Sequence, residues 1–176
     1  MTRRALPILA ALGALIVMGC GESHLAPLPT VEHVDLPRFM GTWYVIANIP
    51  TSMEKNAYAP QETYRLASDG TIETTFTFHA DGYNGEVRQH TARGFVVDTR
   101  TNAVWGMQFV WPLRFDYRIC ALAPDYSTTI IAREKRDYVW IMARTPQVDP
   151  ALYDRLLDAV AALGYERERI QRVPQP

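Results

Sequence analysis

Cys20 is the residue whose surroundings indicate one chemistry most clearly. It ends the stretch Val17-Met-Gly-Cys20, after a positively charged start and an apolar run of about 13 residues at positions 6–18. A charged start, an apolar run shorter than the roughly 20 residues of a membrane span, and small residues at its end are typical of a secretory signal peptide. A cysteine directly after them matches a lipobox, although valine stands where leucine is commoner. We therefore expect a signal peptide at 1–19 and acylation of Cys20 as the mature N-terminus.

Two other interpretations of this leader stay open: an ordinary secretory leader with an incidental cysteine, and a free N-terminal anchor helix. If Cys20 carries two or three acyl chains, it anchors the protein stably to a membrane, which a single chain would not do. Gly21 follows it, and in the pattern of enteric bacteria an aspartate there retains a lipoprotein at the inner membrane. We thus expect the outer membrane of a Gram-negative cell envelope. Residues 21–34 are rich in proline, histidine and small residues, and we expect 20–34 to form an unstructured, lipidated tether.

The remaining reactive residues form no recognisable catalytic or metal site. Cys120 lies in an apolar run without a neighbouring base, so we expect an inert buried thiol that faces outward. His79 and His90 are expected on opposite faces of the sheet, which argues against a metal site that uses both. Glu62 and Glu73 are flanked by threonines and are expected to be solvated. With no nucleophile elbow, phosphate loop or zinc-protease motif in the sequence, we predict no catalytic residue, no metal and no cofactor, and an acid–base pair inside the fold stays open.

The charge of the chain gives no sign of a nucleic-acid partner. The 176 residues include 18 basic and 19 acidic ones, for a formal net charge of −1. Loss of Arg3 and Arg4 with the leader leaves 16 basic residues against 19 acidic ones, or −3. A mildly acidic chain without a basic run lacks the electrostatic footprint of nucleic-acid binding or of a polybasic membrane patch. Its length fits one domain with one sizeable core, which we place at 35–176.

Eight short runs rich in β-branched and aromatic residues predict strands. They are separated by turn residues such as Asp69-Gly70 and lie at 42–49, 61–67, 71–78, 86–97, 103–109, 115–122, 128–132 and 138–143. Regularly spaced short strands are typical of an up-and-down antiparallel barrel, and a β-sandwich is the alternative by spacing alone. The fold class is thus all-β.

One helix follows the strands. Asp149 is a suitable N-cap, Pro150 fits the first helical position and Gly164 fits the C-terminal stop. An apolar stripe runs along it and predicts that it packs flat against another surface; its members are Leu152, Leu156, Val160 and Leu163. A final short strand or extended tail is expected at 165–173, and one helical turn at 35–40.

Three separated motifs together resemble the signature regions of the lipocalin family. They are Gly41-Thr-Trp43 at the start of the first strand, Asp125-Tyr126 in a turn between two strands, and Arg144 at the end of the last strand. The resemblance extends over about 35–175. It implies an eight-stranded barrel with the helix packed outside. It also implies a structural role for Arg144, whose guanidinium would lie over the indole of Trp43 in a cation–π contact worth about 0.5–2 kcal/mol.

Alternating strand direction sorts the loops into two ends of such a barrel. The loops 50–60, 80–85, 110–114 and 133–137 fall at an open mouth, and the loops 68–70, 98–102 and 124–127 fall at a closed base. Trp43 and Arg144 both fall at the base, although 101 positions separate them.

Period-two alternation, with its phase taken from the resemblance, predicts which side chains face the interior. The predicted ligand-binding residues are Val45, Ala47, Phe76, Phe78, Arg88, Trp105, Met107, Phe109, Tyr117, Ile119, Trp140 and Met142. His90 is expected to face inward as well. An eight-stranded barrel has room for one small ligand, so these residues either surround a cavity or fill the interior as core.

An apolar sleeve with Arg88 at its lip suits a fatty acid or a lysophospholipid, whose head group the guanidinium would hold. The first hypothesis is therefore a membrane-tethered lipocalin that binds and stores or transports such a lipid, and haem or another chromophore is a minor variant. The alternatives are an enzyme that acts on a lipid-like substrate and an envelope structural module with a filled barrel. Homodimerisation is left open.

Overall fold

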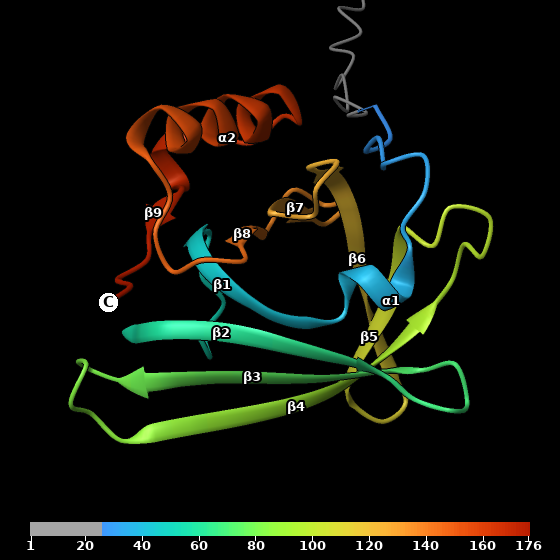
Figure 1. Ribbon diagram of the computed structural model, residues 1–176, viewed down its shortest axis with the longest axis horizontal. Helices are drawn as coiled ribbons and strands as arrows, with labels where there is room; N and C mark the ends of the chain where they lie inside the picture. The colour runs from blue at the N-terminus through green and yellow to red at the C-terminus, as the bar shows by residue number, and fades with distance from the viewer. Residues whose placement is uncertain (1–25) are drawn as a thin grey trace, which may run out of the picture.

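Eight consecutive strands form a closed antiparallel barrel in the computed structural model, which describes residues 26–176 (Figure 1). The strands are β1 (Gly41–Asn48), β2 (Ala57–Leu66), β3 (Ile72–Ala80), β4 (Val87–Val96), β5 (Val104–Val110), β6 (Leu113–Leu122), β7 (Thr128–Ala132) and β8 (Val139–Ala143). Each strand pairs with its neighbours in the chain, and β1 pairs with both β2 and β8, which closes the sheet. The predicted barrel is confirmed, and the β-sandwich is excluded. The signal peptide at 1–19 and Cys20 lie outside the described residues.

The strand boundaries differ from the predicted ones mainly in β2. This strand begins at Ala57, inside the predicted loop 50–60, because an irregularity between Tyr58 and Gln61 lets the sheet accommodate Pro60. Ala59 takes a left-handed φ of +48° there. Proline lacks the N–H that a regular ladder requires, so a bulge is where a strand tolerates it. Strand β7 has the predicted bounds, 128–132.

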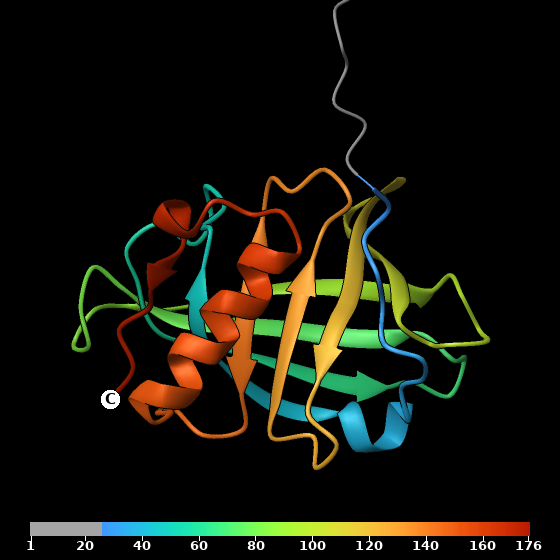
Figure 2. The same ribbon diagram turned by 90° about the horizontal axis from the view of Figure 1, so that it is seen from above.

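The barrel is flanked by two helices that the sequence predicted. Helix α1 (Leu36–Phe39) is one turn whose cap Asp35 accepts a hydrogen bond from the Arg38 N–H. Helix α2 (Pro150–Ala162) begins after Asp149, whose carboxylate accepts from the Leu152 N–H at 2.9 Å. It lies across the outside of the barrel (Figure 2) and packs on β1, β7 and β8 through its apolar stripe. No helix among residues 26–176 is long and apolar enough to cross a membrane.

A bulge in β1 divides the apolar residues between two cores. Val45 pairs with Met142 and belongs to the core inside the barrel, whereas Ala47 pairs with Ile141 and belongs to the core under α2. The extra residue between them, Ile46, shifts the alternation by one position. The prediction that Ala47 faces the interior is therefore wrong, because period-two counting holds only along an uninterrupted ladder.

The base of the barrel is closed by Arg144 and Trp43. The guanidinium carbon lies 3.8 Å from the indole ring centroid, and Trp43 Nε1 donates to the Phe39 carbonyl at 2.9 Å. Arg144 also donates to backbone carbonyl groups of the α1 turn and of β1; these are at Arg38, Phe39, Met40 and Thr42. The predicted stacking is confirmed, and it fixes α1 as a plug under the barrel.

The other signature residues lie at the same end. The Tyr126 hydroxyl accepts a hydrogen bond from the Asp35 N–H at 2.9 Å, and its ring lies 4.1 Å from the Arg38 guanidinium carbon. Asp125 accepts from the Ser127 N–H in the β6–β7 turn. Gly41 has a φ of +92°, a conformation that residues with a Cβ rarely adopt. The Asp125-Tyr126 turn thus holds the entry to α1.

The N-terminal segment 26–34 packs on the barrel, which corrects the expectation of an unstructured tether at 20–34. The segment has no helix or strand, but Leu28 and Val34 are buried. The Val31 N–H donates to the Ile119 carbonyl at 3.0 Å, and the Val34 N–H donates to the Thr101 carbonyl at 2.8 Å. Apolar residues spaced among its prolines hold the segment in place. The overall composition of the segment, which is rich in proline and small residues, does not reveal these contacts.

The C-terminal tail covers the seam between β1 and β2. After the 3₁₀ turn η1 (Arg167–Arg169), strand β9 (Gln171–Arg172) pairs with β1, which confirms the predicted final strand. Further on, Gln175 Nε2 donates to the Val45 and Pro60 carbonyl groups, each at 2.8 Å. The regular pairing of β1 with β2 ends at Tyr44 and Gln61, so the glutamine amide bridges the two strands beyond that point.

Replacement of Arg144 with alanine should destabilise the domain by about 2–3 kcal/mol, because it removes a cation–π contact and leaves backbone carbonyl groups of the base without a donor. Urea unfolding followed by circular dichroism measures the loss. The control is Arg100→Ala, because the Arg100 side chain is 90% exposed in another base turn and, within the described part of the chain, pairs with Asp98 alone. An Arg144→Ala midpoint equal to that of the control would contradict the structural role.

Candidate functional site

The barrel interior contains a cavity of about 460 Å³. Its lining includes Met53 of the β1–β2 loop, Leu113 at the β5–β6 turn and Arg133 of the β7–β8 loop. These belong to three of the four loops predicted at the mouth, so the cavity opens where strand parity places the open end. The interior is thus solid near the base, around Trp43, and hollow toward the mouth.

Ten of the twelve predicted ligand-binding residues belong to the barrel interior or to the cavity. Five line the cavity: Phe76, Met107, Phe109, Tyr117 and Trp140. Five others pack in the barrel core and are not part of its lining: Val45, Phe78, Trp105, Ile119 and Met142. The two exceptions are Ala47, which lies under α2, and Arg88.

Arg88 lies at the mouth end of β4 opposite Phe78, but it does not line the cavity, so its predicted contact with a ligand head group is not supported. Its side chain is 55% exposed and pairs with Glu86 at 3.3 Å. The cation that lines the cavity is Arg133, which is only 16% exposed. One of its terminal nitrogens lies 3.3 Å from the Asp137 carboxylate, while its buried Nε has no hydrogen-bond partner among the described residues. Strand parity could not identify Arg133 because it belongs to a loop.

Glu62 faces the cavity, contrary to the prediction that it is solvated. In the sheet it pairs with Trp43 on one side and with Phe76 on the other, so all three side chains share the inner face. The Tyr64 hydroxyl donates to its carboxylate and lies 2.6 Å from the Tyr117 hydroxyl. A carboxyl group and two phenols therefore form one hydrogen-bonded cluster inside an otherwise apolar barrel.

Burial raises the pKa of Glu62 from 4.5 to about 8, and the nearby Glu54 carboxylate adds to this rise. Glu62 is half-buried because part of its surface borders the cavity, and the surrounding protein shields its carboxyl from bulk water. Burial, reinforced by Glu62, likewise raises the pKa of Tyr117 well above 10. At neutral pH Glu62 and Tyr117 are thus mainly uncharged, because a low dielectric disfavours the ionised form of both groups.

Glu54 joins the β1–β2 loop to the far wall of the cavity. Its carboxylate accepts from Trp140 Nε1 at 2.6 Å and from the Thr51 N–H at 2.7 Å. Two further lining hydroxyls, those of Thr51 and Thr74, are buried and have no partner among residues 26–176. These groups give an otherwise apolar cavity a few points at which a ligand can form hydrogen bonds.

The remaining reactive residues lie where their strand faces predicted. His90 lines the cavity and stacks on Phe78, while His79 points away and its Nδ1 lies 3.3 Å from the Gly85 carbonyl oxygen. Within 26–176 no group of three His, Cys, Asp or Glu side chains could hold a metal ion. Cys120 packs against the core under α2, and burial raises the pKa of its thiol to about 12. The thiol is half-buried and faces outward as expected, and its raised pKa disfavours the reactive thiolate.

A family model described as a lipocalin-like domain matches residues 34–175. The chain belongs to the lipocalin family. Among curated relatives it is 28% identical to the outer membrane lipoprotein Blc of Escherichia coli K12, over 98% of each chain. It is 33% identical to apolipoprotein D of Bos taurus over 93% of each chain, and 27% identical to temperature-induced lipocalin-1 of Arabidopsis thaliana over 84% of this chain and 83% of the relative.

Solved structures show the same lipocalin fold at low sequence identity. Insecticyanin from the tobacco hornworm Manduca sexta superposes with a TM-score of 0.67 at 12% identity, over 86% of each chain. The cockroach allergen Per a 4 superposes with a TM-score of 0.63 at 17% identity, over 84% of this chain and 92% of that one. These likenesses concern the fold alone.

Replacement of Glu62 with glutamine should stabilise this lipocalin and flatten its pH dependence. Below pH 4.5 the carboxyl is protonated in both the folded and the unfolded chain; between pH 4.5 and about 8 only the folded chain keeps the proton. The unfolded state is therefore increasingly favoured as pH rises through this window, and the loss is complete above the folded pKa. We expect Glu62→Gln to gain on the order of 2–4 kcal/mol at pH 8 and little at pH 4.5.

Denaturant titrations across this pH range measure the effect. Glu73→Gln is the matched control, because Glu73 is 42% exposed on β3 and pairs with the exposed Arg65. Parallel pH profiles for the wild type and Glu62→Gln would show that the buried carboxyl is not protonated in the folded state.

Proposed function

We propose that this lipocalin binds a fatty acid or lysophospholipid and stores or transports it in the cell envelope, anchored to the outer membrane through acylated Cys20. The observation that carries the proposal is the cavity of about 460 Å³, open at one end and lined by aromatic residues and methionines. Its volume falls in the range of small-molecule sites, in which apolar walls supply affinity and a few polar groups fix orientation.

The charges around the cavity favour a lipid that enters with its acyl chain first. Glu62 is neutral near pH 7, so an acyl chain can lie against it without desolvating a carboxylate. An anionic head group placed there would instead meet Glu62 and the adjacent Glu54. Arg133 lines the cavity in the β7–β8 mouth loop and retains an unpaired Nε–H among the described residues. A carboxylate or phosphate at this position would receive a charge-assisted hydrogen bond.

The proposed membrane anchor is supported by the sequence around Cys20 and by the names of the related proteins. The Blc proteins of Escherichia coli and Citrobacter freundii are named outer membrane lipoproteins and align with 98% of this chain, which includes the leader. A lipobox cysteine followed by glycine supports the same location here. Acyl chains on Cys20 would hold the cavity close to its source of lipid.

A second candidate function is enzymatic, and the Glu62 cluster favours it. A carboxyl with a pKa of about 8 beside two phenols inside a ligand cavity is the type of arrangement that general acid–base catalysis uses. A change in the mass of the bound lipid over hours that Glu62→Gln abolishes would support catalysis, whereas an unchanged lipid would support a carrier. The cavity toward the mouth argues against the filled-barrel alternative.

Replacement of Ala92 with phenylalanine should abolish lipid retention. Ala92 lines the cavity from β4, so a phenyl ring there occupies the space of the ligand. We expect native mass spectrometry of the wild-type protein to detect a lipid that organic extraction removes. The affinity of Ala92→Phe for the readded lipid should fall at least about tenfold, since a well-packed site accommodates extra methylenes poorly.

Thr91→Phe is the matched control for this substitution. Thr91 precedes Ala92 in β4 and is exposed on the outer face, so the Thr91→Phe substitution adds the same ring outside the cavity. If the wild-type protein retains no lipid, or if both variants bind it equally, this cavity does not hold the ligand.

Replacement of Arg133 with glutamine should weaken binding of an anionic lipid by roughly tenfold, because it removes a charge-assisted hydrogen bond to the head group. Arg88→Gln should leave the affinity unchanged, because Arg88 lies outside the cavity lining and pairs with Glu86. Titration of tryptophan fluorescence with a fatty acid, and with the corresponding uncharged alcohol, measures both effects. An Arg133→Gln loss of equal size for the acid and the alcohol would argue against a charge contact.

A further inference from the structure

Exposed apolar side chains gather around the opening of the cavity. Six of the ten large hydrophobic residues that are exposed within 26–176 belong to the β1–β2 loop or the β5–β6 hairpin; they are Met53, Phe109, Val110, Trp111, Leu113 and Phe115. Trp111, at the hairpin tip, is the most exposed of them at 82%. Two more flank the β3–β4 turn, whereas only Leu66 and Val97 lie near the base turns. Apolar groups clustered in this way mark an interaction surface.

This apolar surface continues into the ligand cavity. Phe109, Val110, Leu113 and Phe115 are exposed and also line the cavity, and the rings of Phe109 and Phe115 contact each other with centroids 6.0 Å apart. An acyl chain that reached the hairpin tip would therefore pass into the barrel along a continuous row of apolar side chains.

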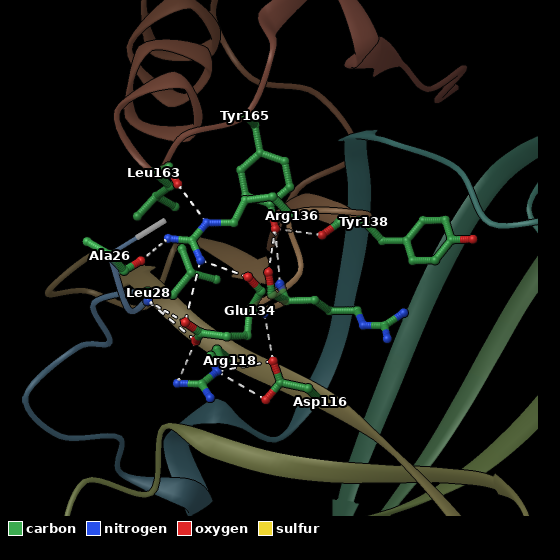
Figure 3. A network of polar contacts seen from close by, with 10 residues as sticks. Ala26, Leu28, Asp116, Arg118, Glu134, Arg136, Tyr138, Leu163 and Tyr165 are labelled. Atoms are coloured by element: carbon green, nitrogen blue, oxygen red, sulfur yellow. Dashed lines mark hydrogen bonds and ion pairs between the residues drawn. The ribbon is translucent and has the colours of Figure 1, made fainter. Parts of the chain in front are cut away.

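The N-terminal segment is fixed at the same end of the barrel by the network in Figure 3. Arg136, in the β7–β8 loop, is only 9% exposed and donates to the Ala26 carbonyl at 2.6 Å and to the Leu163 carbonyl at 3.2 Å. The Leu28 N–H donates to the Glu134 carboxylate, which also pairs with Arg118 at 3.1 Å. The first described residue is thus held against a mouth loop.

The position of Ala26 limits how far Cys20 can lie from the mouth. The two residues are six positions apart, and an extended chain advances at most about 3.3–3.6 Å per residue, so Cys20 can be no more than roughly 20 Å from Ala26. In Figure 2 the β1–β2, β5–β6 and β7–β8 loops all lie along the upper edge and α1 along the lower edge. An anchor at Cys20 therefore brings the upper edge, not the base, to the lipid.

We propose that the mouth of the barrel docks on a phospholipid bilayer, with the Trp111 hairpin inserted at the interface so that the cavity opens onto the lipid. This rests on the proposed anchoring through Cys20, which turns the mouth toward the bilayer and so selects a bilayer over a protein partner. An exposed indole at a hairpin tip suits the headgroup level of a membrane, where its apolar ring and its N–H are both accommodated.

The test measures quenching of tryptophan fluorescence by bromine on the acyl chains of the bilayer. The full chain, purified from its membrane, is reconstituted into vesicles of phosphatidylethanolamine and phosphatidylglycerol, with and without brominated chains. Trp111→Phe identifies the emission that belongs to Trp111. Val97→Trp in the Trp111→Phe background is the matched control, because Val97 is 63% exposed near the β4–β5 turn.

We expect bromine to quench the Trp111 emission roughly twofold or more, because an interfacial indole lies beside the upper acyl chain. The emission of the Val97→Trp control should be unchanged. Equal quenching at both positions, quenching of the control alone, or no quenching of Trp111 would overturn the docking. Cross-linking through position 111 to a second copy, with Trp111 unquenched, would assign the surface to a dimer instead.

The mass of the N-terminal peptide separates this inference from the proposed function. An acylated Cys20 with an unquenched Trp111 means that the anchor is right and the docking is wrong. If Cys20 carries no acyl chain, the proposed anchor has failed, and the same quenching comparison on chain added to preformed vesicles still decides the docking.

Discussion

The stacking of Arg144 on Trp43 determines where this barrel is solid and where it is hollow. The guanidinium binds the carbonyl groups around α1, and the indole N–H binds one of them as well, so the plug, the first strand and the last strand are tied together at one point. The interior next to this point is filled by large rings, including Phe39 and Trp105. Because the floor is closed in this way, the remaining space is confined to the other end.

The cavity combines apolar walls with a few polar groups of reduced charge. Ionisation of Glu62 is suppressed by burial and by Glu54; the Tyr64 hydroxyl donates to its carboxylate and lies in turn beside the Tyr117 hydroxyl. Among residues 26–176, the arginine that lines the cavity is Arg133, and it lies in a mouth loop. This gradient from a neutral interior to a charged mouth matches the two ends of an amphiphile, and the N-terminal segment is held against the same mouth loop that carries Arg133.

Much of the fold follows from local sequence, whereas the details of the site depend on register and loops. Capping by Asp149 and the succession of short strands were predictable, because turns, caps and alternation are encoded within short stretches. The closed barrel and the stacking of Arg144 on Trp43 were predictable only through the resemblance to the lipocalins. Ala47 was misplaced because a bulge adds one residue to β1. Glu62 was missed because its neighbours in space, Trp43 and Phe76, come from other strands. Arg133 lies in a loop, and parity says nothing about loops.

The contacts of Gln175 have a practical consequence for handling the protein. Its amide joins β1 to β2 beyond their last regular pair, and the Pro176 carbonyl accepts from the side chain of Gln147. An affinity tag fused to the carboxyl terminus would therefore disturb the junction of β1 and β2 in the barrel wall, while one at the amino terminus would interfere with the proposed leader processing. The exposed β2–β3 turn at 68–70, whose hydrogen bonds and ion pairs among the described residues involve neither terminal segment, is the better site for an epitope insertion or a fluorophore.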